Sequence, residues 1–581
     1  MAVVACVGIE WLGLCNYDPA APAPIYFTLG NAVTALAFTL AVQNFLKPIY
    51  VFRLAIRHMT TKRLYSMVFA GAFLCVIAAL VPRMSFLHSF PIGYAIVWEM
   101  LATALFLMAY GSVAIAAAVP IKVKPKRVPR FAQAAAQLIS EAGESDHLEL
   151  LKDLRESLPT LIRLATFVEM KHGEERTAFF DFIHRERLEQ ASYAHSLLRI
   201  IADAPFCRTL VDKAPWAVSR MLGVIETERL YARSAESFVR ELAQQALLSD
   251  EGMMDRERKF HGFGTAPLLS ESLFGSPFIV SRYNTLQGYI RADKVTLSVI
   301  ERFNSATVRT FETLIEHRRM DHSYSAMGAK SFYESAFMGL SAIQGAENYD
   351  YRHAMATTRS LTNAITLANK LMAAISDDAY ERLYVDDFKD KHKYDVLGVL
   401  VEIVFDGLKS ISNRFRGPND PFWLMAHEAM SRSFQHIREQ PDGMTPFQQR
   451  LAILIIDGLQ DNMNGWYPSI SRIVLAALGP YRENAQQPNA TAYNILKDAA
   501  YIELQKLPEL ATEHPEKLGD YFPDNVGYDV AKNTLTHTYF GGGTAVTALA
   551  SLNINPVDVA NKALRRRLTD DESKEAEREI Y

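Results

Sequence analysis

The chain of 581 residues is long enough for several domains, and its formal net charge of −4 combines two parts of opposite sign. Residues 1–131 carry eleven Lys and Arg against three acids, a balance of +8, so the remaining 450 residues total −12. A body this acidic repels polyphosphates, which argues against a nucleic-acid partner. Four cysteines without a C-x-x-C spacing are too few for a disulfide framework.

Three apolar segments near the N-terminus predict membrane-spanning helices. Residues 25–46 and 64–81 contain no charge, and residues 92–121 contain only Glu99. At 1.5 Å per residue, runs of about this length cross a bilayer. No polar face repeats at helical spacing, as it would in the helices of a soluble core. We therefore expect a transmembrane domain over residues 25–121.

The positions of Lys and Arg predict the orientation of these spans. Residues 47–65 contain five cations, residues 82–91 contain one, and residues 1–24 contain none. Five more follow the third span, at Lys122, Lys124, Lys126, Arg127 and Arg130. Because Lys and Arg are retained on the cytoplasmic side, we expect residues 1–24 to be extracytoplasmic and the body to be cytoplasmic.

The basic, proline-rich segment 122–131 joins the third span to the body. We expect its five cations to contact anionic lipid headgroups. Its prolines interrupt the helix and predict an extended spacer, because proline cannot donate to a continuing helix.

Polar residues inside the spans are candidates for an intramembrane site. Glu99 is the one ionisable residue in a predicted span, and such carboxylates usually serve an ion path or a contact between helices. If the span begins near Trp98, both residues lie instead at the headgroups as an anchor, which is the interpretation we favour. In an oligomer, a pore could be lined by Glu99, Asn31, Gln43 and Asn44.

From residue 132 onward, apolar residues recur at spacings of three and four, which predicts an all-α body. Only residues 276–283 show an alternation that suits a strand. The Gly, Pro and Ser content of residues 249–293 predicts an irregular connection. We expect it to separate two helical regions and a charged tail to close the chain. These predicted parts are a proximal region, 132–248, a distal domain, 294–562, and the tail, 563–581.

Motifs in the body do not identify a catalytic or metal site. The pairs Glu169/His172 and Asp350/His353 have a spacing that can bind iron in helical proteins. Two such matches are expected by chance among 65 acids and 15 histidines. The phosphate-loop, dinucleotide and nucleophile-elbow motifs are absent. The glycine-rich run Tyr539–Leu552 could hold an anion where it leads into an apolar helix, or form a flexible joint. We therefore predict no metal and no cofactor.

The segment Ser412–Met430, "SNRFRGPNDPFWLMAHEAM", has the most specific pattern in the body. It reads as a turn followed by a helix cap. Alternatively, a polar ligand site or subunit contact is lined by Arg414, Arg416, Asn419 and Asp420. The run "GPNDPF", together with the N-terminal spans, resembles a motif of an uncharacterised family of bacterial predicted membrane proteins. The run departs from that motif in lacking its Ser-Pro. The resemblance implies a location in the cell inner membrane and adds no chemistry.

These features leave three functions open. The first is a non-enzymatic, multi-pass inner-membrane protein whose cytoplasmic region is a sensor or scaffold. The second is an oligomeric ion channel or pore gated by that region. The third is a membrane-tethered hydrolase or metalloenzyme that uses residues 414–420 or 169–172. In each case we expect contact with membrane lipids and a homo-oligomer, and for the scaffold a cytoplasmic protein partner.

Overall fold

The computed structural model is mostly α-helical, which confirms the all-α class in outline. It describes residues 7–9, 14–16, 30, 33–34, 37, 47–57, 59–81, 95–141, 143–171, 185–250, 252–260, 268–286, 296–318, 324–342, 351–374, 383–384, 395–412, 428–430, 432–434, 444–465, 491–505, 507–513, 522, 526–538, 544–549 and 559. The chain forms two compact units, Met1–Phe238 and Val239–Tyr581.

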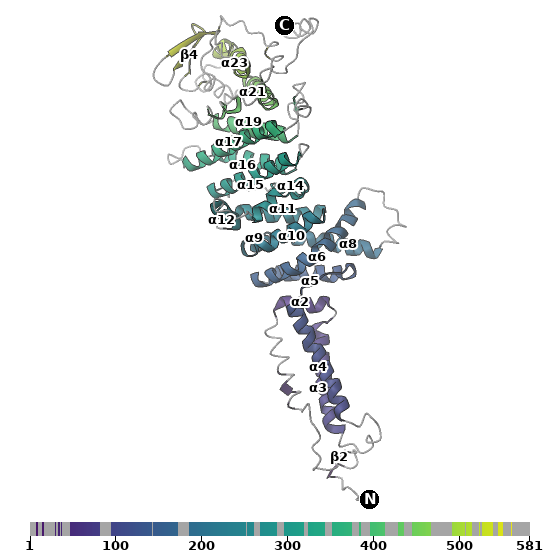
Figure 1. Ribbon diagram of the computed structural model, residues 1–581. Helices are drawn as coiled ribbons and strands as arrows, with labels where there is room; N and C mark the ends of the chain where they lie inside the picture. Colours follow the sequence, from purple (N-terminus) through teal and green to yellow (C-terminus); the bar gives the residue numbers. More distant parts are fainter. Residues whose placement is uncertain are drawn as a thin grey trace. The chain divides into compact units, whose positions relative to one another are not determined.

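Two long apolar helices lie side by side in the first unit (Figure 1), α3 (Thr61–Leu80) and α4 (Ala95–Ala118). Both are long and apolar enough to cross a membrane. They correspond to the second and third predicted spans. The first predicted span, 25–46, lies outside the described residues apart from four isolated helical positions. The described residues therefore contain two helices that are long and apolar enough to cross a membrane, where the sequence predicted three.

Small residues allow α3 and α4 to pack closely. Ala72, Ala102 and Ala109 are buried between the helices. A Cβ atom on Gly71 would lie 3.1 Å from the ring of Phe106, so the glycine leaves room for the aromatic side chain. Close approach through small residues is typical of helices that pair in a bilayer.

The outward faces of this helix pair carry large apolar side chains. Phe73, Met100 and Leu107 are 65%, 68% and 68% exposed. Only 33% of the apolar window of α3 and 22% of that of α4 is buried. Both helices therefore present most of their apolar surface to their surroundings.

A short helix, α2 (Pro48–Ile56), precedes α3 and carries a buried arginine. Pro48 stands in its first turn, where its missing N–H is not needed, and the fixed φ suits a helix start. Ile49, Phe52, Leu54 and Ile56 are buried together with Arg53. A buried guanidinium requires partners for its charge and its donors.

Arg53 joins three separate parts of the first unit. Its Nε donates to Oδ2 of Asp153 at 2.9 Å, and its Nη1 donates to the carbonyls of Ala116 and Ala117 at 3.3 and 3.2 Å. Its Nη2 reaches the Glu149 carboxylate at 3.3 Å. The carboxylates come from α6 (Glu144–Lys171) and the carbonyls from the last turn of α4. Arg53 therefore fastens the end of the apolar pair to α6.

The segment after α4 is fastened to the same helix. Oδ1 of Asp153 accepts the Ile121 N–H at 2.5 Å, and the Ser157 hydroxyl accepts the Val123 N–H at 3.2 Å and donates to the Ile121 carbonyl at 3.0 Å. Ile121 and Val123 are buried, whereas Lys122 between them is exposed. The segment predicted as a spacer is therefore extended at its start, and hydrogen bonds from Ile121 and Val123 bind this extended part to α6.

The remainder of the predicted linker is helical and does not form a spacer. The 3-10 turn η5 (Pro125–Arg127) leads directly into α5 (Val128–Glu141), whose Phe131 ring lies 5.4 Å from that of Phe52. The prolines of this segment stand at helix starts, where their rings fit.

The other helices of the first unit pack around α6. They are α8 (Arg185–Ile200), α9 (Ala204–Lys213), α10 (Pro215–Thr227) and the beginning of α11 (Arg233–Leu248). A short antiparallel pair, β1 (Val7–Ile9) and β2 (Leu14–Asn16), lies near the N-terminus.

The second unit is a succession of helices in which each packs against the next or the next but one (Figure 1). They are α12 (Met253–Phe260), α13 (Leu268–Ser270), the π-helix η7 (Glu271–Gly275), α14 (Pro277–Arg282), α15 (Leu297–Glu316), α16 (Tyr324–Ala342), α17 (Tyr351–Ala374), α19 (Val396–Ser412), α21 (Pro446–Gly465), α23 (Thr491–Leu504) and α24 (Leu507–Glu513).

Two local predictions for this unit were wrong. Residues 276–283 form a helix and not a strand, because the Ser276 hydroxyl accepts the Ile279 N–H as an N-cap and Pro277 occupies the first turn. The described residues between 249 and 293 are largely helical and not irregular. Ser270, Ser276 and Pro277 stand at helix starts, a position that suits the same residue types as a loop does.

A small antiparallel sheet near the C-terminus was not predicted. Its order is β3 (Val526–Asp529), β4 (Thr534–Thr538) and β5 (Thr544–Ala548). Asn533 has a φ of 48° in the turn between β3 and β4, a conformation that asparagine tolerates. The prediction of an apolar helix after the glycine run is therefore wrong, because β5 occupies that position.

We predict that Arg53→Ala destabilises the full-length protein in detergent by about 3–5 kcal/mol, because Asp153 is left buried without its cation. Denaturant unfolding measures the change. Arg208→Ala is the matched control, since Arg208 makes only an exposed pair with Asp212 at 3.8 Å and should change stability by less than about 1 kcal/mol. Equal effects of the two substitutions would contradict the role given to Arg53.

We also predict that Gly71→Val loosens the α3–α4 pair by about 1–3 kcal/mol, because the added methyl groups meet the Phe106 ring. Gly111→Val is the control, since a Cβ there has nothing within 4 Å. Thermal unfolding in detergent should therefore separate the two valine variants, and identical midpoints would show that Gly71 is not a packing position.

Candidate functional site

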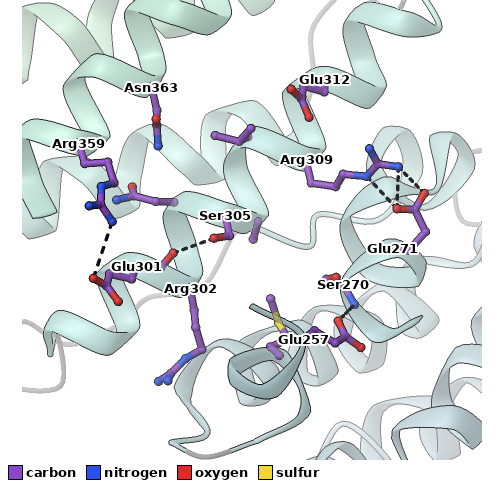
Figure 2. A pocket seen from close by; sticks show the side chains of 14 residues that line it. Glu257, Ser270, Glu271, Glu301, Arg302, Ser305, Arg309, Glu312, Arg359 and Asn363 are labelled. Atoms are coloured by element: carbon purple, nitrogen blue, oxygen red, sulfur yellow. Dashed lines mark hydrogen bonds and ion pairs between the residues drawn. The ribbon is translucent and has the colours of Figure 1, made fainter. Parts of the chain in front are cut away.

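A cavity of about 560 Å³ opens in the second unit between α12, η7, α15 and α17 (Figure 2). Such a volume is typical of small-molecule sites. Its lining contains both carboxylates and guanidinium groups, together with serine and asparagine side chains and a few apolar ones. The partners of each charged group decide which of them a ligand could use.

One wall is formed by an ion pair of ideal geometry. Arg309 on α15 donates through Nε and Nη2 to the two oxygens of Glu271, at 2.8 and 2.7 Å. The Glu271 hydrogen bond raises the pKa of the Arg309 guanidinium. Bidentate pairs of this kind are among the strongest hydrogen bonds in proteins.

The position of Glu271 depends on the π-helical turn that it begins. A Cβ atom on Gly275 would lie 2.5 Å from the Glu271 carboxylate, so a glycine leaves the space that this side chain occupies. Single π-turns occur frequently at functional sites.

Two charged residues of the lining, Glu257 and Arg302, are engaged in hydrogen bonds with neighbouring parts of the chain. Oε1 and Oε2 of Glu257 accept the backbone N–H groups of Leu269 and Ser270 at 2.8 and 3.0 Å. Arg302, 1% exposed, donates to the Leu247 carbonyl at 2.7 Å and to Asp250 at 2.9 Å. The Arg302 hydrogen bond lowers the pKa of Asp250.

The opposite wall carries a looser pair. Nη1 of Arg359 on α17 lies 3.9 Å from Oε1 of Glu301 on α15, and the two side chains are 62% and 25% exposed. Ser305 and Asn363 stand on the same side of the cavity (Figure 2). This pair is held by much weaker geometry than Arg309–Glu271.

Behind the cavity, a buried polar network connects three helices. Oδ1 of Asn304 accepts the Tyr333 and Ser360 hydroxyls, each at 2.8 Å, and its Nδ2 donates to the Ala356 carbonyl at 3.4 Å. Burial raises the pKa of Tyr333, so its hydroxyl remains a donor. A satisfied network of this kind holds α15, α16 and α17 in one arrangement.

A second charged cluster lies between α16 and α19, around Lys330. Its Nζ lies 2.6 Å from Glu402 and 3.4 Å from Glu334. Burial raises the pKa of the neighbouring Asp406 to about 6, and the charges of Glu334 and Glu402 act in the same direction.

The residues predicted from the Ser412–Met430 segment lie outside the described part of the chain. These are Arg414, Arg416, Asn419 and Asp420. Three of the four pore candidates, Asn31, Gln43 and Asn44, also lie outside it. The fourth, Glu99, is 6% exposed, lies one turn into α4 close to Cys75 of α3, and its Oε2 has no described hydrogen-bond partner.

The cations that follow α4 are accessible to solvent. Lys122, Lys124, Lys126 and Arg130 are exposed, and Arg127 is half-buried. Arg57 on the same side donates to the Val119 carbonyl at 2.7 Å. Arg53 was not predicted, since no local pattern marks an arginine whose partner lies a hundred residues away.

Glu169, whose spacing to His172 was attributed to chance, has a structural role. Its carboxylate accepts the backbone N–H groups of Arg233 and Ser234 at 2.6 and 3.0 Å and so caps α11. Its expected partner, His172, lies outside the described residues. Within the described residues, no group of three or more His, Cys, Asp or Glu could hold a metal ion.

Comparison with known proteins gives no relative. No protein-family model, no curated protein and no solved structure matches the chain.

We predict that Asp406 makes stability fall as the pH rises. Its pKa is about 6 in the folded chain against an ordinary value of 3.8, so between these values the folded state binds more protons than the unfolded one. With allowance for partial exposure, roughly 2 kcal/mol should be lost between pH 4 and pH 7. Asp406→Asn should remove this loss from the stability–pH profile of the detergent-solubilised protein.

Glu428→Gln is the control, because Glu428 is exposed and its ion pair within the described residues is with Arg432, one helical turn away. Its profile should follow that of the wild type. A profile of Asp406→Asn parallel to both would show that Asp406 is not the titrating group.

Proposed function

We propose that the chain is a non-enzymatic, multi-pass protein of the cell inner membrane, whose helical body is a cytoplasmic sensor or scaffold. The observation that carries this proposal is the apolar pair α3–α4, exposed on its outer faces and fastened to the body through Arg53.

Membrane insertion is supported by the exposure of these helices. The core helix of a soluble protein is mostly buried, whereas most of each apolar window is exposed here. In water, this much apolar surface would be unfavourable by about 25 cal/mol per Å², and lipid removes that penalty. With residues 25–46 as a further span, the chain crosses the membrane three times.

The orientation is supported by the cations at one end of the helix pair. Lys62 and Arg63 begin α3, and Lys122 and Lys124 follow α4, so these exposed charges belong to the same end. Cations are retained on the cytoplasmic side, which leaves the N-terminus outside. The cations are also placed to contact anionic lipid headgroups, each contributing about 1 kcal/mol near the surface.

A role in sensing is supported by the stiffness of the junction. Arg53 binds carbonyls at the end of α4 and carboxylates on α6 at once, so a displacement of α4 is passed to α6. In a scaffold, the same contacts hold α6 in a fixed relation to the apolar pair. A cytoplasmic protein partner and a homo-oligomer fit either role.

The alternatives receive less support. Glu99 is buried beside α3, a position that suits a contact between helices better than the lining of a pore. For a hydrolase or metalloenzyme, the described lining of the cavity contains no histidine or cysteine, and its strongest carboxylate–arginine pair is engaged internally.

We predict that the full-length protein stays in the membrane pellet after a carbonate wash. Leu107→Asp, which places a carboxylate on the exposed face of α4, should lower this fraction several-fold because a central charge opposes insertion by about 3 kcal/mol. Leu107→Ala is the control and should remain in the pellet. In a variant whose native cysteines Cys6, Cys15, Cys75 and Cys207 are replaced by alanine, a cysteine introduced by Arg208→Cys should react with a membrane-impermeant maleimide only after cells are permeabilised.

Extraction of the wild type by carbonate would refute membrane anchoring, and labelling of Arg208→Cys in intact cells would refute the orientation. Conductance of the purified protein in liposomes would favour the pore over the scaffold.

A further inference from the structure

We propose that Arg57, Lys62 and Lys122 bind the headgroup phosphate of one anionic phospholipid, and that this lipid is the signal that the proposed sensor detects. The proposal rests on the proposed function and deepens it by naming the ligand. These three residues, called the headgroup site below, hold a single lipid. The other exposed cations at this end attract a charged membrane surface without selecting a molecule.

Arg57, at the end of α2, is a half-buried cation without a countercharge. Its Nη2 donates to the Val119 carbonyl at 2.7 Å, and its side chain makes no ion pair with any described residue. Burial lowers the pKa of the Arg57 guanidinium, and the charge of Arg53 acts in the same direction against that of Asp153. A guanidinium withdrawn from water in this way gains most from an anion that accepts its remaining N–H groups.

The nearby carboxylates already have partners. Oδ2 of Asp153 accepts from Nε of Arg53 at 2.9 Å, and its Oδ1 accepts the Ile121 N–H at 2.5 Å. The Glu149 carboxylate is shared between Arg53 and a lysine of its own helix. Residues 47–65 and 118–131 each contain five cations and no Asp or Glu. The anion that fits Arg57 is therefore one supplied by another molecule.

Lys62 and Lys122 lie at the same end of the apolar pair as Arg57. Lys122 follows closely after Val119, whose carbonyl Arg57 binds, and Lys62 stands in the first turn of α3. Both lysines are exposed. The backbone around Lys122 is fixed, because the N–H groups of both its neighbours bind side chains of α6. Less entropy is lost when a ligand meets a site that is already held in place.

Exposed apolar side chains continue from these cations along both helices. Phe69 and Phe73 follow Lys62 at helical spacings, so they share its face of α3, and they are 59% and 65% exposed. On α4, Ile115 and Val119 are 54% and 48% exposed shortly before the chain reaches the cations. A molecule with an anionic head and an apolar tail contacts both kinds of surface. A free anion would use the cations alone.

A lipid held by Arg57 acts on the junction between α4 and α6. Arg57 stands one helical turn after Arg53 on α2, and the two arginines bind successive carbonyls at the end of α4. Arg53 also holds Asp153 of α6. An anion that fixes Arg57 therefore favours the attached arrangement of α4 and α6, and its binding energy stabilises that arrangement.

Titration of the full-length protein in a neutral detergent with dioleoyl phosphatidylglycerol tests the proposal. Native mass spectrometry measures the fraction of protein that retains one lipid, and thermal unfolding measures the stabilisation. We expect phosphatidylglycerol to be retained and to raise the unfolding midpoint. Dioleoyl phosphatidylcholine, which carries no net charge, should do neither. Inorganic phosphate at the same concentration should leave the midpoint unchanged, because it has no apolar tail.

Arg57→Gln and Lys122→Gln should each weaken retention of phosphatidylglycerol by about tenfold, since each removes a charged hydrogen-bond donor from the phosphate. Lys126→Gln is the matched control, because it removes the same charge from an exposed position in η5 and should weaken retention by only about twofold. Thermal unfolding without lipid checks that the variants are folded. Lys122 is exposed, so its variant keeps the test valid if Arg57→Gln does not fold.

The proposal would be overturned if phosphatidylglycerol were not retained, if phosphatidylcholine were retained equally, or if inorganic phosphate stabilised the protein as well as the lipid does. Equal losses in Lys126→Gln and Lys122→Gln would also overturn it, because they would show diffuse attraction without a site. Each of these results leaves carbonate resistance as it was, so membrane anchoring would stand. Conversely, carbonate extraction of a protein that still retains phosphatidylglycerol would overturn the anchoring alone.

Discussion

The buried ion pair between Arg53 and Asp153 is the constraint on which the first unit depends. Both side chains are withdrawn from solvent, at 1% and 0% exposure, so each requires the other and the polar groups around it. Burial raises the pKa of Asp153, and the Ile121 N–H and the Arg53 charge oppose that rise. Because Asp153 accepts from α2 and from the chain after α4 together, the apolar helices and α6 are held in one arrangement.

The pair also explains why the apolar helix α4 can end where it does. Arg53 binds the last carbonyls of α4, groups that have no partner within their own helix. The cations beyond this point are exposed, with the apolar residues between them buried against α6. The same few residues thus satisfy the end of a helix, carry a group of exposed cations and connect the apolar pair to α6.

The second unit combines a rigid frame with one weakly held pair of charges. Asn304 and its two hydroxyl donors connect three helices, and the Glu271–Arg309 pair is fixed by a π-turn that needs a glycine at position 275. Arg359 and Glu301 line the same cavity, with Nη1 and Oε1 3.9 Å apart. A preformed cavity of this size limits the entropy lost when a small ligand binds.

The sequence predicted those features that depend on composition over long windows. Apolar runs of about the length that crosses a bilayer identified α3 and α4, and helical periodicity identified most of the body. Short-range signals failed where one residue type serves two purposes. Pro277 and Ser276 begin a helix although both also suit a loop, and the alternating threonines of β4, visible in the sequence, were overlooked beside a glycine run.

By itself, then, the sequence determined the all-α class, two of the three apolar helices it predicted, and the end of those helices at which the cations gather, because these follow from hydrophobicity and charge counted along the chain. Only the tertiary structure decided which charged residues form ion pairs with one another. Arg53 meets Asp153 across a hundred residues, and Arg359 meets Glu301 across two helices, although neighbouring residues in the sequence give no sign of either contact. Such pairs are set by how helices pack, and packing depends on the shape of every surface involved.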